Sequence, residues 1–167
     1  LKDFKGIISD IGGPTANMYL STCKIMDASG ACKSKRCVYP EKCDNLKINY
    51  GAQTALLEKI KKINHIKKVF ISSGIRYDLV DFTETSSNTY MQAIIQEHIS
   101  GQIKIAPEHI NVKVLSLMGK PDNKQLLDFL NNFKKICTEE NKELYIIKLK
   151  KLLKNNDLSL TYLSPDL

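Results

Sequence analysis

The sequence predicts a single α/β domain over residues 1–167, built on parallel strands that alternate with helices. Short apolar segments alternate with helical segments along most of the chain, which is the pattern of right-handed βαβ units. A chain of 167 residues is long enough for one domain with a hydrophobic core and short for two. Its 43% hydrophobic and 26% charged content is that of a globular domain rather than a disordered chain.

The first half of the chain contains two predicted strands and one helix. Residues 5–11 (KGIISDI) form an apolar run that a Gly-Gly-Pro sequence ends, which predicts a buried strand. Residues 52–63 (AQTALLEKIKKI) place apolar side chains near helical spacing and predict an amphipathic helix. Residues 68–72 form a second apolar strand, followed by polar residues and a glycine.

The second half repeats this alternation, with short apolar runs for the strands and three- to four-residue apolar spacing for the helices. The predicted elements are, in order, a helix over 88–99, a short strand from 102, a short helical turn over 112–119, a helix over 126–140, a strand over 143–147 and a last helix over 148–156.

Three polar clusters directly follow three of the predicted strands. They are GGPTAN (12–17), SSGIR (72–76) and APEH (106–109). In a parallel sheet the carboxyl ends of the strands meet at one edge, where ligands bind. We therefore expect the three clusters to converge and to form the functional site.

The first cluster contains a glycine pair, Gly12 and Gly13. Glycine permits positive φ and lets a ligand approach without a Cβ atom in the way, but an ordinary tight turn after a strand uses the same residues. The sequence contains no G-x-x-x-x-G-K-[ST] and no G-x-G-x-x-G, so neither a P-loop nor a Rossmann dinucleotide site is predicted.

The other two clusters contain charged residues, and each has two interpretations. Arg76 could present its guanidinium to a carboxylate or phosphate of a ligand, or could pair with Asp78. Glu108 and His109 could perform acid–base chemistry or hold a ribose hydroxyl, or could form a satisfied pair at a helix start.

Four of the five cysteines, Cys23, Cys32, Cys37 and Cys43, lie in one stretch with the spacing C-x8-C-x4-C-x5-C. Thiolates are soft ligands, so this stretch could hold zinc or an iron–sulfur cluster. Unligated structural thiols and disulfides are the alternatives, although a Lys-rich chain without a secretion signal argues against disulfides. Cys137, in a predicted helix, is expected to be a small buried hydrophobe.

The formal charge is +7, from 25 Lys and Arg against 18 Asp and Glu. The lysines are scattered in KKINHIKK, NNFKK and IKLKKLLKNN, which is typical of solvated helix faces, so charge alone gives RNA binding only weak support. His65 and His98 are likewise expected to be solvated. No apolar run approaches the roughly 20 residues that span a bilayer, and a cytoplasmic protein without membrane contact is expected.

Four stretches together resemble the YgiQ-type radical S-adenosylmethionine (SAM) proteins, a family of largely unassigned activity. The stretches are DIGGPTANMY, the cysteine segment ending CVYPEKC, FISSGIRYDL and IKIAPEHINVKVLSLMGKP. They occur in this order, and the resemblance covers about residues 5–147.

The resemblance implies a partial (β/α)6 barrel in which a [4Fe–4S] cluster reductively cleaves SAM to a 5′-deoxyadenosyl radical. It implies that residues 5–11 are the second barrel strand. By the same resemblance, the SAM or substrate cavity is lined by Gly12, Gly13, Pro14, Thr15, Ser72, Ser73, Arg76 and Glu108.

The chain departs from the family pattern in three places. The C-x3-C-x2-C sequence that holds the radical-generating cluster is absent, so we expect the chain to be a fragment that is inactive alone and lacks upstream sequence. Cys23, Cys32, Cys37 and Cys43 could hold a second cluster or zinc. The regions after Pro121 and Ile147 look shortened relative to the family.

These residues lead to two hypotheses about the function. The first is a part of a radical SAM enzyme whose substrate is unknown. The second is a metal-stabilised, non-enzymatic module that binds RNA or another anionic ligand. Missing barrel strands would leave a parallel sheet edge open, and an open edge could pair two copies in a dimer.

Overall fold

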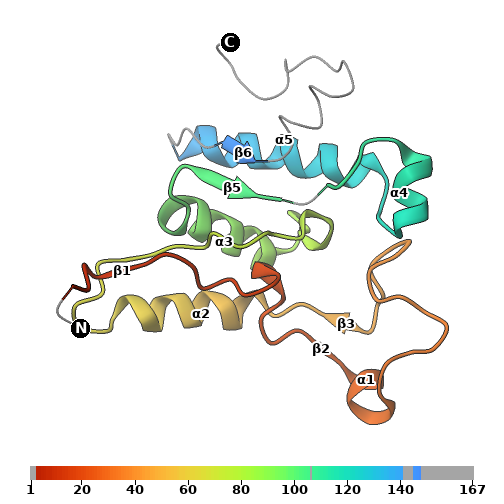
Figure 1. Ribbon diagram of the computed structural model, residues 1–167, viewed down its shortest axis with the longest axis horizontal. Coiled ribbons are helices and arrows are strands. Elements are labelled where there is room, and N and C mark those ends of the chain that lie inside the picture. The colour runs from red at the N-terminus through yellow and green to blue at the C-terminus, as the bar shows by residue number, and fades with distance from the viewer. Residues whose placement is uncertain (1–2, 106, 141–144, 148–167) are drawn as a thin grey trace.

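A computed structural model describes residues 3–105, 107–140 and 145–147 of the chain (Figure 1). The elements, in order, are β1 (Ile7–Ile8), η1 (Ala16–Met18), β2 (Thr22–Cys23), α1 (Lys24–Ser29), β3 (Leu46–Lys47), α2 (Tyr50–Lys61), β4 (Lys68–Val69), η2 (Tyr77–Leu79), α3 (Thr85–Ala93), η3 (Ile94–His98), β5 (Gln102–Lys104), α4 (Val112–Met118), α5 (Asn123–Glu139) and β6 (Tyr145–Ile147). The predicted last helix over 148–156 lies outside the described residues.

The parallel pairing that the sequence predicts is confirmed. β1 pairs with β4, and β5 pairs with β6, both in parallel. A parallel bridge between Ile75 and Ile105 joins the two pairs, and the Ile75 amide donates to the carbonyl of Lys104 at 2.8 Å. The strand segments therefore lie in the order β1, β4, β5, β6, and the molecule is a mixed α/β fold with a small parallel sheet.

The helices follow from local sequence signals. α2 begins after Asn49, whose side-chain oxygen accepts from the amide of Ala52 at 3.0 Å. α4 matches the short helical segment predicted over 112–119, and Gly119 ends it in the left-handed conformation that favours glycine. α3 continues into η3, a π-helical turn. Among the described helices, none has the length and apolar character needed to cross a membrane.

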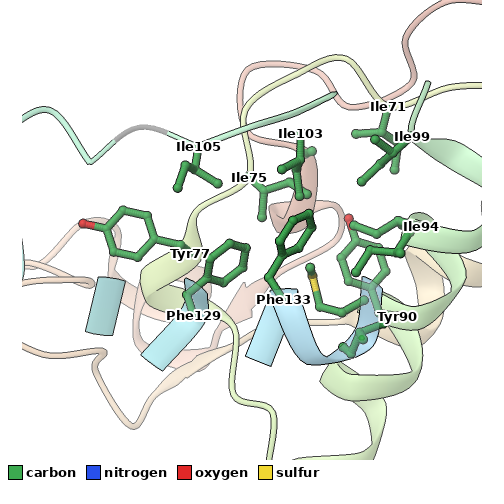
Figure 2. Packing of buried hydrophobic residues seen from close by; sticks show 14 of the residues in the cluster. Ile71, Ile75, Tyr77, Tyr90, Ile94, Ile99, Ile103, Ile105, Phe129 and Phe133 are labelled. Carbon is green, nitrogen blue, oxygen red and sulfur yellow. The ribbon is translucent and has the colours of Figure 1, made fainter. Parts of the chain in front are cut away.

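The hydrophobic core lies between α3, α5 and the strand segments. α5 places its buried residues at helical spacing: Leu126, Phe129, Phe133, Ile136 and Cys137. Figure 2 shows Phe129 and Phe133 facing Ile75 and Ile103 of the sheet. The expectation that Cys137 is buried is confirmed.

Two features differ from the sequence-based expectations. No helix or strand was predicted for the cysteine stretch, but it contains α1 and is flanked by an antiparallel pair, β2 with β3. The expectation that His98 is solvated is wrong, because its side chain is buried and its Nδ1 lies 2.8 Å from the carbonyl oxygen of Val69. This contact comes from a strand 29 residues away, which helical spacing does not reveal.

Candidate functional site

Asp10 joins the first two polar clusters at the carboxyl ends of β1 and β4. Its Oδ1 accepts from the amides of Gly12 (3.0 Å), Ser72 (3.0 Å) and Ser73 (3.1 Å). Its Oδ2 accepts from the hydroxyl of Ser73. One exposed carboxylate therefore fixes the glycine loop against the serine loop, which is the convergence that a parallel sheet predicts for these two clusters.

The hydrogen bonds lower the pKa of Asp10. Partial burial alone would raise this pKa, but the bonds from the Ser73 hydroxyl and from the amides of Gly12, Ser72 and Ser73 together outweigh it. Because the folded-state pKa lies below the unfolded-state value of about 4, the carboxylate stabilises the fold above that pH, and the stabilisation is lost as the pH falls through the folded-state pKa.

We therefore expect Asp10→Asn to flatten the pH dependence of stability. Between pH 7 and about pH 3, the variant should lose less unfolding free energy than the wild type, because it has no carboxylate to protonate. Urea unfolding across this range measures the difference, with Asp27→Asn as the control for loss of one exposed carboxylate on α1. An unchanged slope in Asp10→Asn would contradict the role given to this carboxylate.

Asn17 forms a second connection between the same two loops. It is 1% exposed, its Nδ2 donates to the carbonyl of Arg76 at 3.0 Å, and its Oδ1 accepts from the Arg76 amide at 2.9 Å. The neighbouring Ala16 amide donates to the carbonyl of Gly74 at 2.9 Å, and the buried Gln53 of α2 donates to the Ala16 carbonyl. The glycine loop is thus held to the serine loop through both main chain and side chain.

Gly12 stands where the two loops approach most closely. A Cβ atom at this position would lie 2.5 Å from the Cβ of Ser73, a separation that side chains do not tolerate. Gly13, by contrast, has a φ of +63° and open space where its Cβ would be, and Gly74 in the serine loop is also open on this side. Two stretches of main chain are therefore accessible beside the Asp10 junction.

The third cluster is attached to the second through the sheet rather than through its charged side chains. The bridge between Ile75 and Ile105 brings the two strand ends together. Glu108, at a φ of +63°, lies 3.9 Å from Lys120 Nζ, and the His109 Nδ1 accepts from the amide of Asn111 at 2.9 Å. The alternative in which His109 serves a local turn before α4 is the one this geometry favours.

Arg76 pairs with Asp78. Its Nε donates to Asp78 Oδ1 at 3.1 Å, and its second guanidinium contact is to Asp78 Oδ2. Of the two interpretations of this arginine, the intramolecular pair is therefore the one that the structure contains. A ligand carboxylate or phosphate would have to compete with Asp78 for the same guanidinium.

The four clustered cysteines are all free thiols. Cys23 is buried in β2, Cys43 is half-buried, and Cys32 and Cys37 are exposed. Cys37 and Cys43 are joined by a main-chain hydrogen bond of 2.9 Å. In the described part of the chain, no three cysteine sulfurs lie within 4.8 Å of one another. The prediction of zinc or a second cluster at these residues stays a prediction.

Cys43 lines an open hollow of about 490 Å³ with Lys35, Arg36, Lys42 and Asp44 among its neighbours. The main-chain hydrogen bond from Asn45, helped by the charge of Lys35, lowers the pKa of the Cys43 thiol. This favours the thiolate, which is the form that binds soft metals. The lining carries charges of both signs, with three basic and two acidic residues.

The resemblance implies two cofactors, SAM and the radical-generating [4Fe–4S] cluster, and the residues of this chain relate to them differently. The main chain is open at Gly13 and Gly74, and the Thr15 side chain makes no capping bond to η1, so main-chain groups and one hydroxyl beside the Asp10 junction remain free to meet a ligand such as SAM. The radical-generating cluster does not fit this chain, because the C-x3-C-x2-C sequence is missing.

The sequence analysis missed Asp10, Asn17 and Gln53 as site-building residues. Asp10 and Asn17 lie inside the DIGGPTANMY stretch, so the available signal was a carboxylate and an amide placed after a predicted strand; the expectation that this strand is buried is wrong, because Ile7 of β1 is exposed and Ile8 is half-buried. Their partners lie 59 to 63 residues away, and only the folded chain shows them.

Comparison with known proteins finds relatives that are much longer than this chain. It is 50% identical over 143 residues to a UPF0313 protein of Fusobacterium nucleatum, covering 86% of this chain and 25% of the relative. It is 44% identical over 147 residues to a UPF0313 protein of Clostridium botulinum, covering 88% of this chain and 23% of the relative.

The chain therefore spans about a quarter of the length of the curated relatives it matches. No model of a known protein family matches the chain. No solved structure matches it either. The chain is thus similar to one segment of these UPF0313 proteins.

Proposed function

We propose that this chain is a segment of the radical SAM domain of a longer YgiQ-type protein, which binds a [4Fe–4S] cluster and SAM and acts on a substrate not yet known. The observation that carries the proposal is the Asp10 junction. It holds the glycine loop and the serine loop together at the carboxyl ends of two adjacent parallel strands, where ligands of such sheets bind.

In this proposal the chain supplies part of the cofactor surface and none of the radical-generating cluster. The cluster, held by other sequence, would supply the electron for reductive cleavage. Gly12, Gly13, Pro14 and Thr15 would present main chain and one hydroxyl to the SAM headgroup, and Asp10 would fix this loop in place. Ser72, Ser73, Arg76 and Glu108 would line the adjoining cavity, with Ser73 held by Asp10 and Arg76 held by Asp78.

The outer edge of β1 suits this assignment. Within the described residues β1 pairs only with β4, and Ile7 on β1 is 47% exposed. An exposed apolar strand edge is a template for another strand. A preceding barrel strand would cover it in the longer protein, and a second copy would cover it in a dimer of this chain.

A segment exchange tests the proposed function. The 143-residue matched segment of the Fusobacterium nucleatum relative is replaced by this chain, and the product is reconstituted anaerobically with iron and sulfide and reduced in the presence of SAM. We expect 5′-deoxyadenosine to form with the unmodified relative and with the exchanged protein, and to fall about tenfold or more in the exchanged protein carrying Asp10→Ala, since a displaced SAM loop costs about that factor or more.

The control in this experiment is Asp27→Asn, which removes a carboxylate outside the site. If the iron-loaded relative forms no 5′-deoxyadenosine, radical SAM chemistry is excluded for this segment. If the relative is active while the folded, iron-loaded exchanged protein is not, this chain does not supply the cofactor surface.

A further inference from the structure

Three potential metal ligands gather on the side of the sheet from which β4 and β5 begin, away from the Asp10 junction. Glu58 lies in the last turns of α2, and Glu97 and His98 end η3. One carboxylate oxygen from each glutamate and one ring nitrogen of His98 all lie within 4.8 Å of one another. In the described part of the chain, this is the one group of three such ligands.

The main chain holds one ring nitrogen of His98. The imidazole is 2% exposed, and its Nδ1 lies 2.8 Å from the carbonyl oxygen of Val69 in β4. A carbonyl oxygen only accepts hydrogen bonds, so Nδ1 is the donor in this contact and Nε2 is the ring nitrogen left for a metal. A histidine that binds a metal through one ring nitrogen usually donates the N–H of the other to a carbonyl or carboxylate oxygen. This hydrogen bond fixes the tautomer and the ring orientation.

A cation already occupies the position between the two carboxylates. Lys61 Nζ lies 3.0 Å from Glu58 Oε1 and also contacts Glu97 Oε2. The Glu58, Glu97 and Lys61 side chains are between 33% and 48% exposed, so an ion can reach this position and the lysine can leave it for water. Glu97 and His98 come from a π-helical turn, a local geometry often found at functional sites.

We propose that Glu58, Glu97 and His98 form a divalent-cation site in which the Lys61 ammonium acts as the resident cation and is displaced when the metal binds. Two carboxylate oxygens and one imidazole nitrogen suit manganese, iron or zinc, with water completing the coordination. The ion would tie α2 to the turn before β5. The site is independent of the proposed function, because none of its residues belongs to the polar clusters.

Manganese(II) is the probe that tests this site, because it is a hard ion that binds carboxylate and imidazole in preference to the thiolates of the cysteine stretch. Binding to the full chain is measured by electron paramagnetic resonance, and the site is located by the broadening of amide NMR signals near the bound ion. We expect about one ion per chain and selective broadening around Glu58 and His98.

Variants of the exposed ligands avoid disturbing the core. Glu58→Gln and Glu97→Gln should each weaken binding by about tenfold or more, since a lost ligand should matter at least as much as a lost outer contact. Lys61→Gln should strengthen binding, because the competing ammonium is gone. Glu139→Gln and Lys135→Gln are the matched controls, since this pair is an exposed ion pair on α5, and both should bind as the wild type does.

The pattern of the variants decides the proposal. Tighter binding in Lys61→Gln together with weaker binding in Glu58→Gln and Glu97→Gln supports it. No manganese binding by the wild type, or binding that Glu58→Gln and Glu97→Gln leave unchanged, overturns it and leaves Lys61 as a simple ion-pair partner. Circular dichroism of each variant confirms that the fold is kept, so a loss of binding reports on the site.

Discussion

Asn17→Asp is expected to destabilise the domain by more than about 3 kcal/mol. The Asn17 side chain is 1% exposed, and its Nδ2 donates to the Arg76 carbonyl. In aspartate this nitrogen becomes an oxygen that faces the carbonyl, so an acceptor meets an acceptor, the Arg76 carbonyl loses its donor, and a charge is buried. Asn17→Ala should cost about 2–4 kcal/mol, because it leaves both the amide and the carbonyl of Arg76 unpaired.

Urea unfolding of the purified chain, followed by far-ultraviolet circular dichroism, measures both variants. Asn64→Asp is the matched control, because it makes the same chemical change at an exposed position outside the site. It should stay within about 0.5 kcal/mol of the wild type. If Asn17→Asp is as stable as Asn64→Asp, the connection between the glycine loop and the serine loop does not depend on Asn17.

Gly12→Ala is expected to destabilise the domain by about 1–3 kcal/mol. The added Cβ would meet the Cβ of Ser73 at 2.5 Å, so one of the two loops must move. Gly74→Ala is the control in the neighbouring loop, because nothing lies within 4 Å of its added Cβ. It should be neutral or slightly stabilising, since alanine lowers the conformational entropy of the unfolded chain.

A double-mutant cycle assigns the effect of Gly12→Ala to the contact with Ser73. Ser73→Gly alone should destabilise, because the hydrogen bond from the Ser73 hydroxyl to Asp10 is lost. In the Ser73→Gly background, however, Gly12→Ala should lower the free energy of unfolding clearly less than in the wild type, because the Cβ of residue 73 is gone. Equal costs in the two backgrounds would show that the two loops do not approach each other at this point.

The sequence was sufficient for the parts of the fold that depend on local pattern. α2 and α5 follow from apolar spacing, and the parallel pairing follows from alternation of strands with helices. The meeting of the glycine loop with the serine loop was predicted for the same reason. Each of these features is set by residues close together in the chain or by the general geometry of parallel sheets.

Features that depend on distant partners were not predictable. Nothing in the sequence distinguishes Asp10 from other acidic residues. It joins the two loops because the amides of Ser72 and Ser73, 62 and 63 residues away, donate to its carboxylate. His98 follows the charged Glu97 in the predicted helix, yet its side chain is buried and its Nδ1 contacts the carbonyl of Val69. β2 and β3 pair over two residues each, which is too short for period-2 alternation to show.

Hydrogen exchange of the reconstituted segment-exchanged protein, with and without SAM, tests the central claim most directly. The claim is that the loops joined by Asp10 contact the cofactor. It predicts that SAM slows amide exchange in peptides covering 10–19 and 72–76, and leaves α5 unchanged. Protection by SAM that is confined to other parts of the protein, with both loops exchanging at their original rates, would contradict it.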